Sequence, residues 1–178
     1  MTATLEIRWH ARAGQGAKTA AQVLALGLLE AGKSVQAFPE YGPERRGAPL
    51  RAFTRISDDP IRRHDSVEHP DVVVVLEPSV MHETDVTEGL VDGGVVIVNA
   101  AEEPPELEGC DVRCVPATRI ASAGGSGFAN VVMLGAVAAV LGEPPLEALE
   151  DAAARQLGGK ADPFTVRAAV REGYECLA

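Results

Sequence analysis

The sequence has few aromatic side chains and lacks any long apolar stretch. Aromatic residues make up 4% of its 178 residues, so the core of a chain that is 46% hydrophobic has to be built from Val, Leu, Ile and Ala. The apolar runs fall well short of the roughly 20 residues that a membrane-spanning helix needs. Charged and polar side chains interrupt residues 1–20, which therefore do not form the pattern of a secretory signal peptide.

Cysteine is also scarce, and its spacing excludes two classes of protein. Cys110, Cys114 and Cys176 are odd in number and contain no Cys-x-x-Cys pair, so they neither build a disulfide framework nor hold an iron–sulfur cluster. No Asn-x-Ser/Thr glycosylation site is present. The four histidines show neither i, i+4 pairing nor zinc-type spacing with cysteines, so no metal site is expected. These absences predict a cytoplasmic protein with reduced cysteines.

The formal net charge of −10 is unevenly distributed along the chain. Residues 1–63 hold ten of the sixteen Lys and Arg but only six of the twenty-six Asp and Glu, a local balance of +4. Residues 64–178 hold the other six basic and twenty acidic residues, a balance of −14. An acidic bulk argues against nucleic acid or an anionic membrane as a partner. An anionic ligand, if one binds, is expected to meet the first third of the chain.

Hydrophobic periodicity predicts alternating strands and helices. Leu5, Ile7 and Trp9 alternate with polar residues as in a strand, and the mostly apolar segment Ala17–Ala31 is predicted to be a helix buried on more than one side. Further strands are expected at Ser34–Phe38, Leu50–Ile56, Val72–Leu76, Val95–Val98 and Val112–Val115. Further helices are expected at Ser79–Leu90, Asn130–Leu141, Leu146–Leu157 and, with Asp162 as N-cap, from Pro163 to Cys176.

The order of these elements defines the expected fold. Strands that alternate with helices are typical of an α/β layer with a mostly parallel sheet. We expect a Rossmann-like three-layer fold with a glycine loop after the first strand and helices at the C-terminal end. No internal repeat or inter-domain linker interrupts the pattern, so residues 1–178 are predicted to form one domain.

Gly14-Gln15-Gly16, between the first strand and the first helix, permits two interpretations. It fits the start of a dinucleotide-binding fingerprint, but Thr19 stands where the third glycine belongs and Phe38 where an acidic residue is expected. The run Gly16–Thr19 resembles the end of a phosphate-binding P-loop with Ala17 as an extra residue. The favoured interpretation is a tight turn whose free N–H groups face a partner or an anion. A free-standing nucleotide- or CoA-binding module is the alternative.

The segment 38–51 is predicted to be a loop of defined shape between two strands at a sheet end. Three prolines and two glycines restrict its backbone, which suits a surface that another molecule recognises. Arg45, Arg46 and Arg51 can clamp a carboxylate or phosphate by bidentate donation. Alternatively, the acidic residues of the same loop neutralise these arginines. The density of proline and glycine favours an interface.

Five runs of residues are distinctive when they are taken together. They are Gly14-Gln15-Gly16, Phe38-Pro-Glu-Tyr-Gly-Pro-Glu-Arg-Arg-Gly-Ala-Pro49, Arg55-Ile-Ser, Pro60-Ile61-Arg62 and Pro70-Asp71-Val72. In this order they resemble the gamma subunit of 2-oxoacid:ferredoxin oxidoreductases, with the pyruvate and branched-chain oxoacid branches most similar. The resemblance extends from Arg8 to about Leu141. The related subunit of indolepyruvate-type enzymes is the alternative within this family.

The resemblance implies a share in an enzyme rather than a complete active site. Complexes of this family oxidatively decarboxylate a 2-oxoacid to an acyl-CoA and CO2 and reduce ferredoxin, with thiamine diphosphate and iron–sulfur clusters on other subunits. No catalytic residue, cofactor or metal is therefore expected on this chain, and its expected partners are alpha-, beta- and delta-type subunits. The predicted interface residues, which by position and charge also suit contact with CoA, are Gly14, Gln15, Gly16, Glu40, Tyr41, Gly42, Pro43, Glu44, Arg45, Arg46, Gly47 and Arg51.

Overall fold

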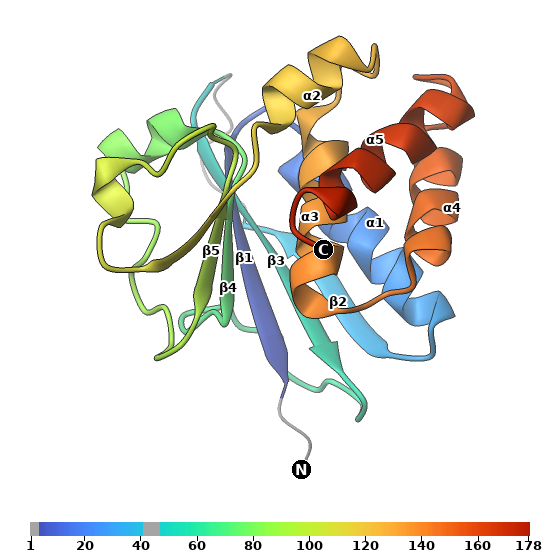
Figure 1. Ribbon diagram of the computed structural model, residues 1–178. Helices are drawn as coiled ribbons and strands as arrows, with labels where there is room; N and C mark the ends of the chain where they lie inside the picture. Colours follow the sequence, from blue (N-terminus) through green and yellow to red (C-terminus); the bar gives the residue numbers. More distant parts are fainter. Residues whose placement is uncertain (1–3, 41–46) are drawn as a thin grey trace.

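The computed structural model describes residues 4–40 and 47–178 and contains a six-stranded sheet (Figure 1). The strands are β1 (Leu5–Arg12), β2 (Ser34–Pro39), β3 (Pro49–Ser57), β4 (Val72–Val75), β5 (Val95–Val98) and β6 (Asp111–Cys114). Their order across the sheet is β2-β3-β1-β4-β5-β6. β1, β4, β5 and β6 run parallel, whereas β3 pairs antiparallel with both β1 and β2. The sheet is mostly parallel, as predicted, with an antiparallel hairpin at one edge.

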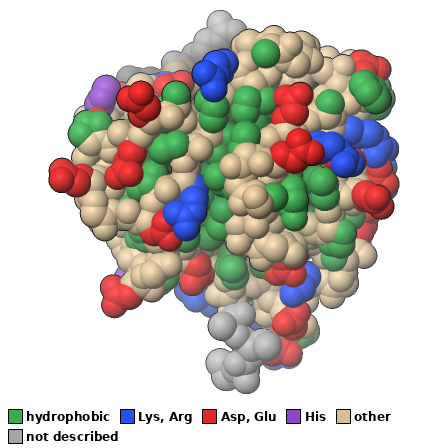
Figure 2. Space-filling model, viewed as in Figure 1, with side chains coloured by type: hydrophobic (Ala, Val, Ile, Leu, Met, Phe, Trp, Pro, Cys, Tyr) green, Lys and Arg blue, Asp and Glu red, His purple; other side chains and the backbone are tan. Residues whose placement is uncertain are grey.

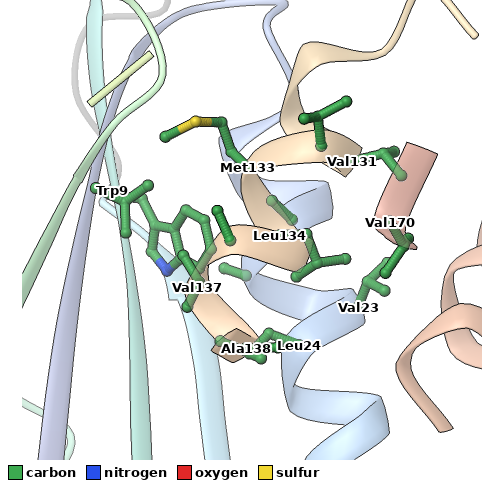
Figure 3. Packing of buried hydrophobic residues seen from close by; sticks show 14 of the residues in the cluster. Trp9, Val23, Leu24, Val131, Met133, Leu134, Val137, Ala138 and Val170 are labelled. Atoms are coloured by element: carbon green, nitrogen blue, oxygen red, sulfur yellow. The ribbon is translucent and has the colours of Figure 1, made fainter. Parts of the chain in front are cut away.

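The α-helices gather on one face of this sheet (Figure 1). They are α1 (Ala17–Glu30), α2 (Ala117–Ala123), α3 (Ala129–Leu141), α4 (Leu146–Leu157) and α5 (Pro163–Glu175). Their buried side chains join Ile7, Trp9 and Ala11 of β1 in the main core, which is mostly aliphatic (Figure 3). Trp9 is fully buried there, and its Nε1 donates to Thr54 Oγ1 at 3.0 Å. Within residues 4–40 and 47–178, no helix is long and apolar enough to cross a membrane.

Most of the predicted elements are confirmed to within one or two residues. The predicted burial of α1 on more than one side is also confirmed, because it contacts β2 and β3 as well as α4. Leu26 and Leu29 of this helix nevertheless stay exposed. Asp162 caps α5 as expected, since its Oδ2 accepts from the backbone N–H of Thr165 at 2.9 Å. Figure 2 shows acidic side chains scattered over one face of the molecule, with Lys and Arg among them.

The opposite face of the parallel strands carries a second, smaller core. Its buried members are Val73, Val75, Val80, Val86, Val96, Val98 and Leu107. The short 3-10 helices η1 (Pro78–His82) and η2 (Pro105–Leu107) lie in the segments that supply several of these side chains. The third layer of the fold is therefore made of 3-10 turns and loops. β4 and β5 are covered on both faces, as is typical of parallel strands with unbroken valine-rich sequences.

One predicted helix, Ser79–Leu90, is wrong. The chain leaves η1 after His82 and continues in turns. The cause is a long-range contact, because the buried Arg8 of β1 donates from Nη2 to the carbonyl of Val86 at 3.0 Å and to that of Glu88 at 2.5 Å. A continuous helix would commit its carbonyls to its own i→i+4 hydrogen bonds instead. α2, a helix of seven residues, was not predicted from the sequence.

α3 and α5 cross with their backbones in close contact at two glycines. A Cβ atom on Gly135 would lie 1.9 Å from the carbonyl oxygen of Val170, and one on Gly173 would lie 1.8 Å from that of Val132. Each would overlap with a backbone atom that cannot move unless the helices separate. These two glycines therefore set the spacing within the helix layer.

Gly135→Ala is expected to lower the free energy of unfolding by about 1–3 kcal/mol through overpacking, although alanine has the higher helix propensity by about 1 kcal/mol. Urea unfolding followed by circular dichroism measures the change. Gly27→Ala in α1 is the control, because the nearest atom to its added Cβ is the side-chain Cγ of Pro144 at 3.0 Å. A Gly135→Ala protein as stable as the wild type contradicts this account of the packing.

Candidate functional site

The glycine turn, Gly14–Gly16, connects the C-terminal end of β1 to α1. Gly16 has a φ of 83° and caps α1 without a side-chain hydrogen bond, so it supplies no partner to the first-turn N–H groups. A Cβ atom on Gly16 would lie 2.5 Å from Asn130 Nδ2, which donates to the carbonyl of Gly16 at 3.3 Å. The left-handed backbone and this close approach both require glycine at position 16. The predicted tight turn is therefore confirmed.

A pocket of about 440 Å³ opens beside the glycine turn. It lies at the C-terminal ends of β1, β4 and β5, where the chain passes from one side of β1 to the other. Open parallel sheets hold ligands at such a switch point. Besides the turn, its polar lining residues are Thr19, Glu77, Asn99, Thr118, Asn130 and Lys160. The position of the pocket in the sheet and its polar lining are therefore both typical of a ligand-binding crevice.

Glu77 and Asn99 were not predicted as site residues. Asn99 donates from Nδ2 to Thr118 Oγ1 at 2.8 Å and accepts from the N–H of Thr118 at 3.1 Å, which ties the end of β5 to α2. Burial opposes ionisation of Glu77, but hydrogen bonds from Gln15 and Ser79 lower its pKa, so it is a carboxylate. The sequence did contain a signal for both residues. Each follows closely on a buried parallel strand, and α/β sheets bind ligands at the C-terminal ends of such strands.

The hairpin loop between β2 and β3 is described in part. Six of the predicted site residues lie outside the described residues, namely Tyr41, Gly42, Pro43, Glu44, Arg45 and Arg46. Glu40 and Arg51 form an ion pair with two hydrogen bonds, of which Arg51 Nη2 to Glu40 Oε1 measures 2.8 Å. Both side chains are about one third exposed, at 33% and 37%. At Arg51 the structure thus agrees with neutralisation by an acidic residue of the same loop.

The structure brings the glycine turn next to the return end of the hairpin loop. The N–H of Ala13 donates to the carbonyl of Ala48 at 3.0 Å. Arg12 Nη1 donates to the carbonyl of Gly47, also at 3.0 Å. Two segments that are distant in the sequence, Gly14–Gly16 and Gly47, therefore belong to one surface at the end of the sheet. Arg12 was not among the predicted site residues.

His10, on the face of β1 opposite the α-helices, is a buried neutral side chain. It is 3% exposed, and its Nε2 accepts from Arg8 Nε at 3.1 Å. Burial, together with the nearby cations of Arg8 and Arg51, lowers the pKa of His10 to about 3. His10 thus acts as a hydrogen-bond acceptor for Arg8. In the part of the chain that the structure describes, no three His, Cys, Asp or Glu side chains are grouped so that they could hold a metal ion.

Comparison with known proteins finds relatives along nearly the whole chain. The family model described as pyruvate ferredoxin/flavodoxin oxidoreductase matches residues 6–176. The chain is 46% identical over 179 residues to pyruvate synthase subunit PorC of Thermotoga maritima, covering 96% of this chain and 93% of that protein. It is 45% identical over 172 residues to the pyruvate/ketoisovalerate oxidoreductases common subunit gamma of Thermococcus kodakarensis, covering 93% of each. The crystal structure of pyruvate oxidoreductase subunit PORC from Thermotoga maritima matches with a TM-score of 0.80 at 42% identity, covering 97% of this chain and 96% of that one.

The open α/β sheet, its glycine turn and these relatives define a class of protein, the gamma-type subunits of oxoacid oxidoreductases. The chain belongs to the pyruvate ferredoxin/flavodoxin oxidoreductase family. The resemblance that the five sequence runs indicated is thereby confirmed, and the α/β fold expected of the chain is confirmed with it.

The depressed pKa of His10 predicts a loss of stability in mild acid. Below pH ~6.5 the unfolded chain takes up a proton at His10 that the folded chain does not bind, so unfolding becomes more favourable as the pH falls towards 3. Each pH unit in this window costs about 1.4 kcal/mol. Between pH 7 and pH 5 the wild type is therefore expected to lose about 2 kcal/mol more than His10→Gln, whose amide oxygen also accepts from Arg8.

Urea unfolding of both proteins at pH 7 and pH 5 measures this difference. His64→Gln is the control, because substitution of another histidine outside this buried cluster should leave the pH dependence of the wild type unchanged. An identical pH dependence in the wild type and His10→Gln would show that His10 is not held neutral.

Proposed function

We propose that this chain is the gamma subunit of a 2-oxoacid:ferredoxin oxidoreductase, with pyruvate as the favoured 2-oxoacid. The complex decarboxylates the 2-oxoacid oxidatively, forms acyl-CoA and CO2, and passes the electrons to ferredoxin. The observation that carries this proposal is the 46% identity with a pyruvate synthase subunit over 96% of the chain. The Pro-Glu-Tyr-Gly-Pro-Glu run that begins at Pro39 argues against the indolepyruvate-type subunit.

In this proposal the chain supplies shape rather than a reactive centre. Thiamine diphosphate and the iron–sulfur clusters are placed on alpha-, beta- and delta-type partner subunits, and the complex is placed in the cytoplasm. This proposal is supported by several charged side chains at the end of the sheet, which form hydrogen bonds or ion pairs with other residues of this chain. Glu77 accepts from Gln15 at 2.7 Å, and Arg51 is paired with Glu40. Groups that are tied in this way hold a surface in one shape.

The proposed contact surface joins the glycine turn to the hairpin loop. Gly14–Gly16 and residues 40–47 are proposed to face the thiamine-binding subunits, and the backbone contacts at Gly47 and Ala48 support this placement of the two segments on one surface. We assign contact with the anionic co-substrate CoA to the arginines of the loop. Because Arg51 is paired with Glu40, a phosphate has to compete with that carboxylate for it. The proposed CoA contacts are Arg45, Arg46 and, in competition with Glu40, Arg51.

Co-expression with the partner subunits tests the proposed function. A tagged chain is expected to capture the alpha-, beta- and delta-type subunits, and the captured complex should reduce ferredoxin only when pyruvate and CoA are both present. Assays with 2-ketoisovalerate and indolepyruvate distinguish the branches of the family. Turnover by the isolated chain, or failure to capture any partner, contradicts the proposal. Calorimetry of the isolated chain with NAD, ATP and CoA tests the alternative of a free-standing binding module.

Substitution of the loop arginines tests the contact with CoA. In the complex, Arg45→Gln with Arg46→Gln is expected to raise the KM for CoA about tenfold, the loss of roughly 1.4 kcal/mol that one charge-assisted hydrogen bond supplies. Arg51→Gln should raise it less, because Glu40 already neutralises that cation. The KM for pyruvate should not change. Arg113→Gln on β6, whose partner is Asp111, is the matched control. Unchanged KM for CoA and unchanged assembly would remove CoA contact from the proposal.

A further inference from the structure

Arg12, the last residue of β1, uses all three nitrogens of its guanidinium group. Its Nε donates to Ser79 Oγ at 2.9 Å, and its Nη2 donates to the carbonyl of Ser79 at 3.2 Å and to Glu83 Oε1 at 2.6 Å. Its Nη1 donates to the carbonyl of Gly47 at 3.0 Å. One side chain thus joins η1 and the following turn to the start of β3, segments that lie 35 to 71 positions away from it in the sequence.

The backbone around Arg12 extends the same set of contacts to the glycine turn. The N–H of Arg12 donates to Gln15 Oε1 at 2.8 Å, and its carbonyl accepts from the N–H of Gln15 at 3.1 Å. Gln15 Nε2 in turn donates to Glu77 Oε2 at 2.7 Å. Glu77 Oε1 accepts from the N–H of Ser79, which closes a ring of hydrogen bonds around the turn.

The side-chain contacts of Arg12 lie where the ladder between β1 and β3 ends. Arg12 and Pro49 are the last pair of the β1–β3 register, and the N–H and C=O groups of such a non-hydrogen-bonded pair point away from the partner strand. Beyond this pair, one backbone hydrogen bond among the described residues, from the N–H of Ala13 to the carbonyl of Ala48, joins the two segments. The relative position of the turn and the hairpin therefore depends on the Arg12 side chain.

We propose that Arg12 is a positioning residue, which sets the glycine turn and the Gly47 end of the hairpin at the spacing that the partner subunits recognise. This proposal rests on the proposed function. A planar fork with five donors reaches Gly47, Ser79 and Glu83 at once, whereas the single ammonium of lysine cannot span these acceptors. Arginine is therefore required at this position, and a cation alone is insufficient.

Arg12→Lys and Arg12→Met in the co-expressed complex test this role. Both variants are expected to raise the KM for CoA about tenfold or to weaken subunit capture by a similar factor, with the KM for pyruvate within twofold of the wild type. Arg113→Met on β6, a matched arginine whose partner is Asp111, should behave as the wild type. An Arg12→Lys protein that is impaired as strongly as Arg12→Met in the KM for CoA or in subunit capture supports the requirement for the guanidinium geometry.

Hydrogen exchange of the isolated chain separates positioning from folding. Arg12→Met should speed amide exchange at least tenfold in peptides that cover residues 13–20 and 47–53, with no change in α3 and α5. Arg12 variants with wild-type KM for CoA, wild-type capture and wild-type exchange overturn this inference and leave the proposed function intact. A wild-type complex that fails to form or to turn over pyruvate overturns the proposed function itself.

Discussion

The buried charges of β1 and β3, on the face opposite the α-helices, are the constraint on which the rest of the structure depends. Arg55 is fully buried, donates to Glu6 Oε1 at 2.6 Å, and stands with its guanidinium carbon 5.5 Å from the centre of the Phe38 ring. Arg8 is nearly as buried and donates to the carbonyls of Val86 and Glu88. A buried charge that loses its partners costs several kcal/mol, so these arginines hold the loops that cover them.

The two faces of the sheet are therefore stabilised by different interactions. On one face, odd-numbered residues of β1 such as Ile7 and Trp9 pack against α-helices through an aliphatic core. On the other face, hydrogen bonds from charged side chains replace much of the α-helix packing that covers this face in an ordinary doubly wound sheet. The strand that carries both faces continues into Arg12 and the glycine turn. The glycine turn therefore continues a strand whose side chains are buried on both faces of the sheet.

Much of the fold was predictable because its signals are local. The alternation in β1, the valine runs of β4 and β5, and the Asp162-Pro163 start of α5 each depend on neighbours within a few residues. The helix expected over Ser79–Leu90 failed because carbonyls in that segment bond to a side chain about 80 positions earlier. The site was predictable in the same uneven way. The glycine turn was predicted from the sequence. Arg12 and Asn99 were not, because their hydrogen-bond partners lie too far away along the chain for a local pattern to reveal them.

The amino-acid sequence alone determined the α/β class, the position of the glycine turn and the family of the chain. Those properties follow from periodicity, from glycine's access to positive φ and from runs of contiguous residues. Only the tertiary structure decided that Arg51 is paired with Glu40, that His10 is neutral, and that the turn and the hairpin share one surface. Each of these properties depends on distances between atoms of different strands. The fold sets these distances, and a pattern in the sequence does not reveal them.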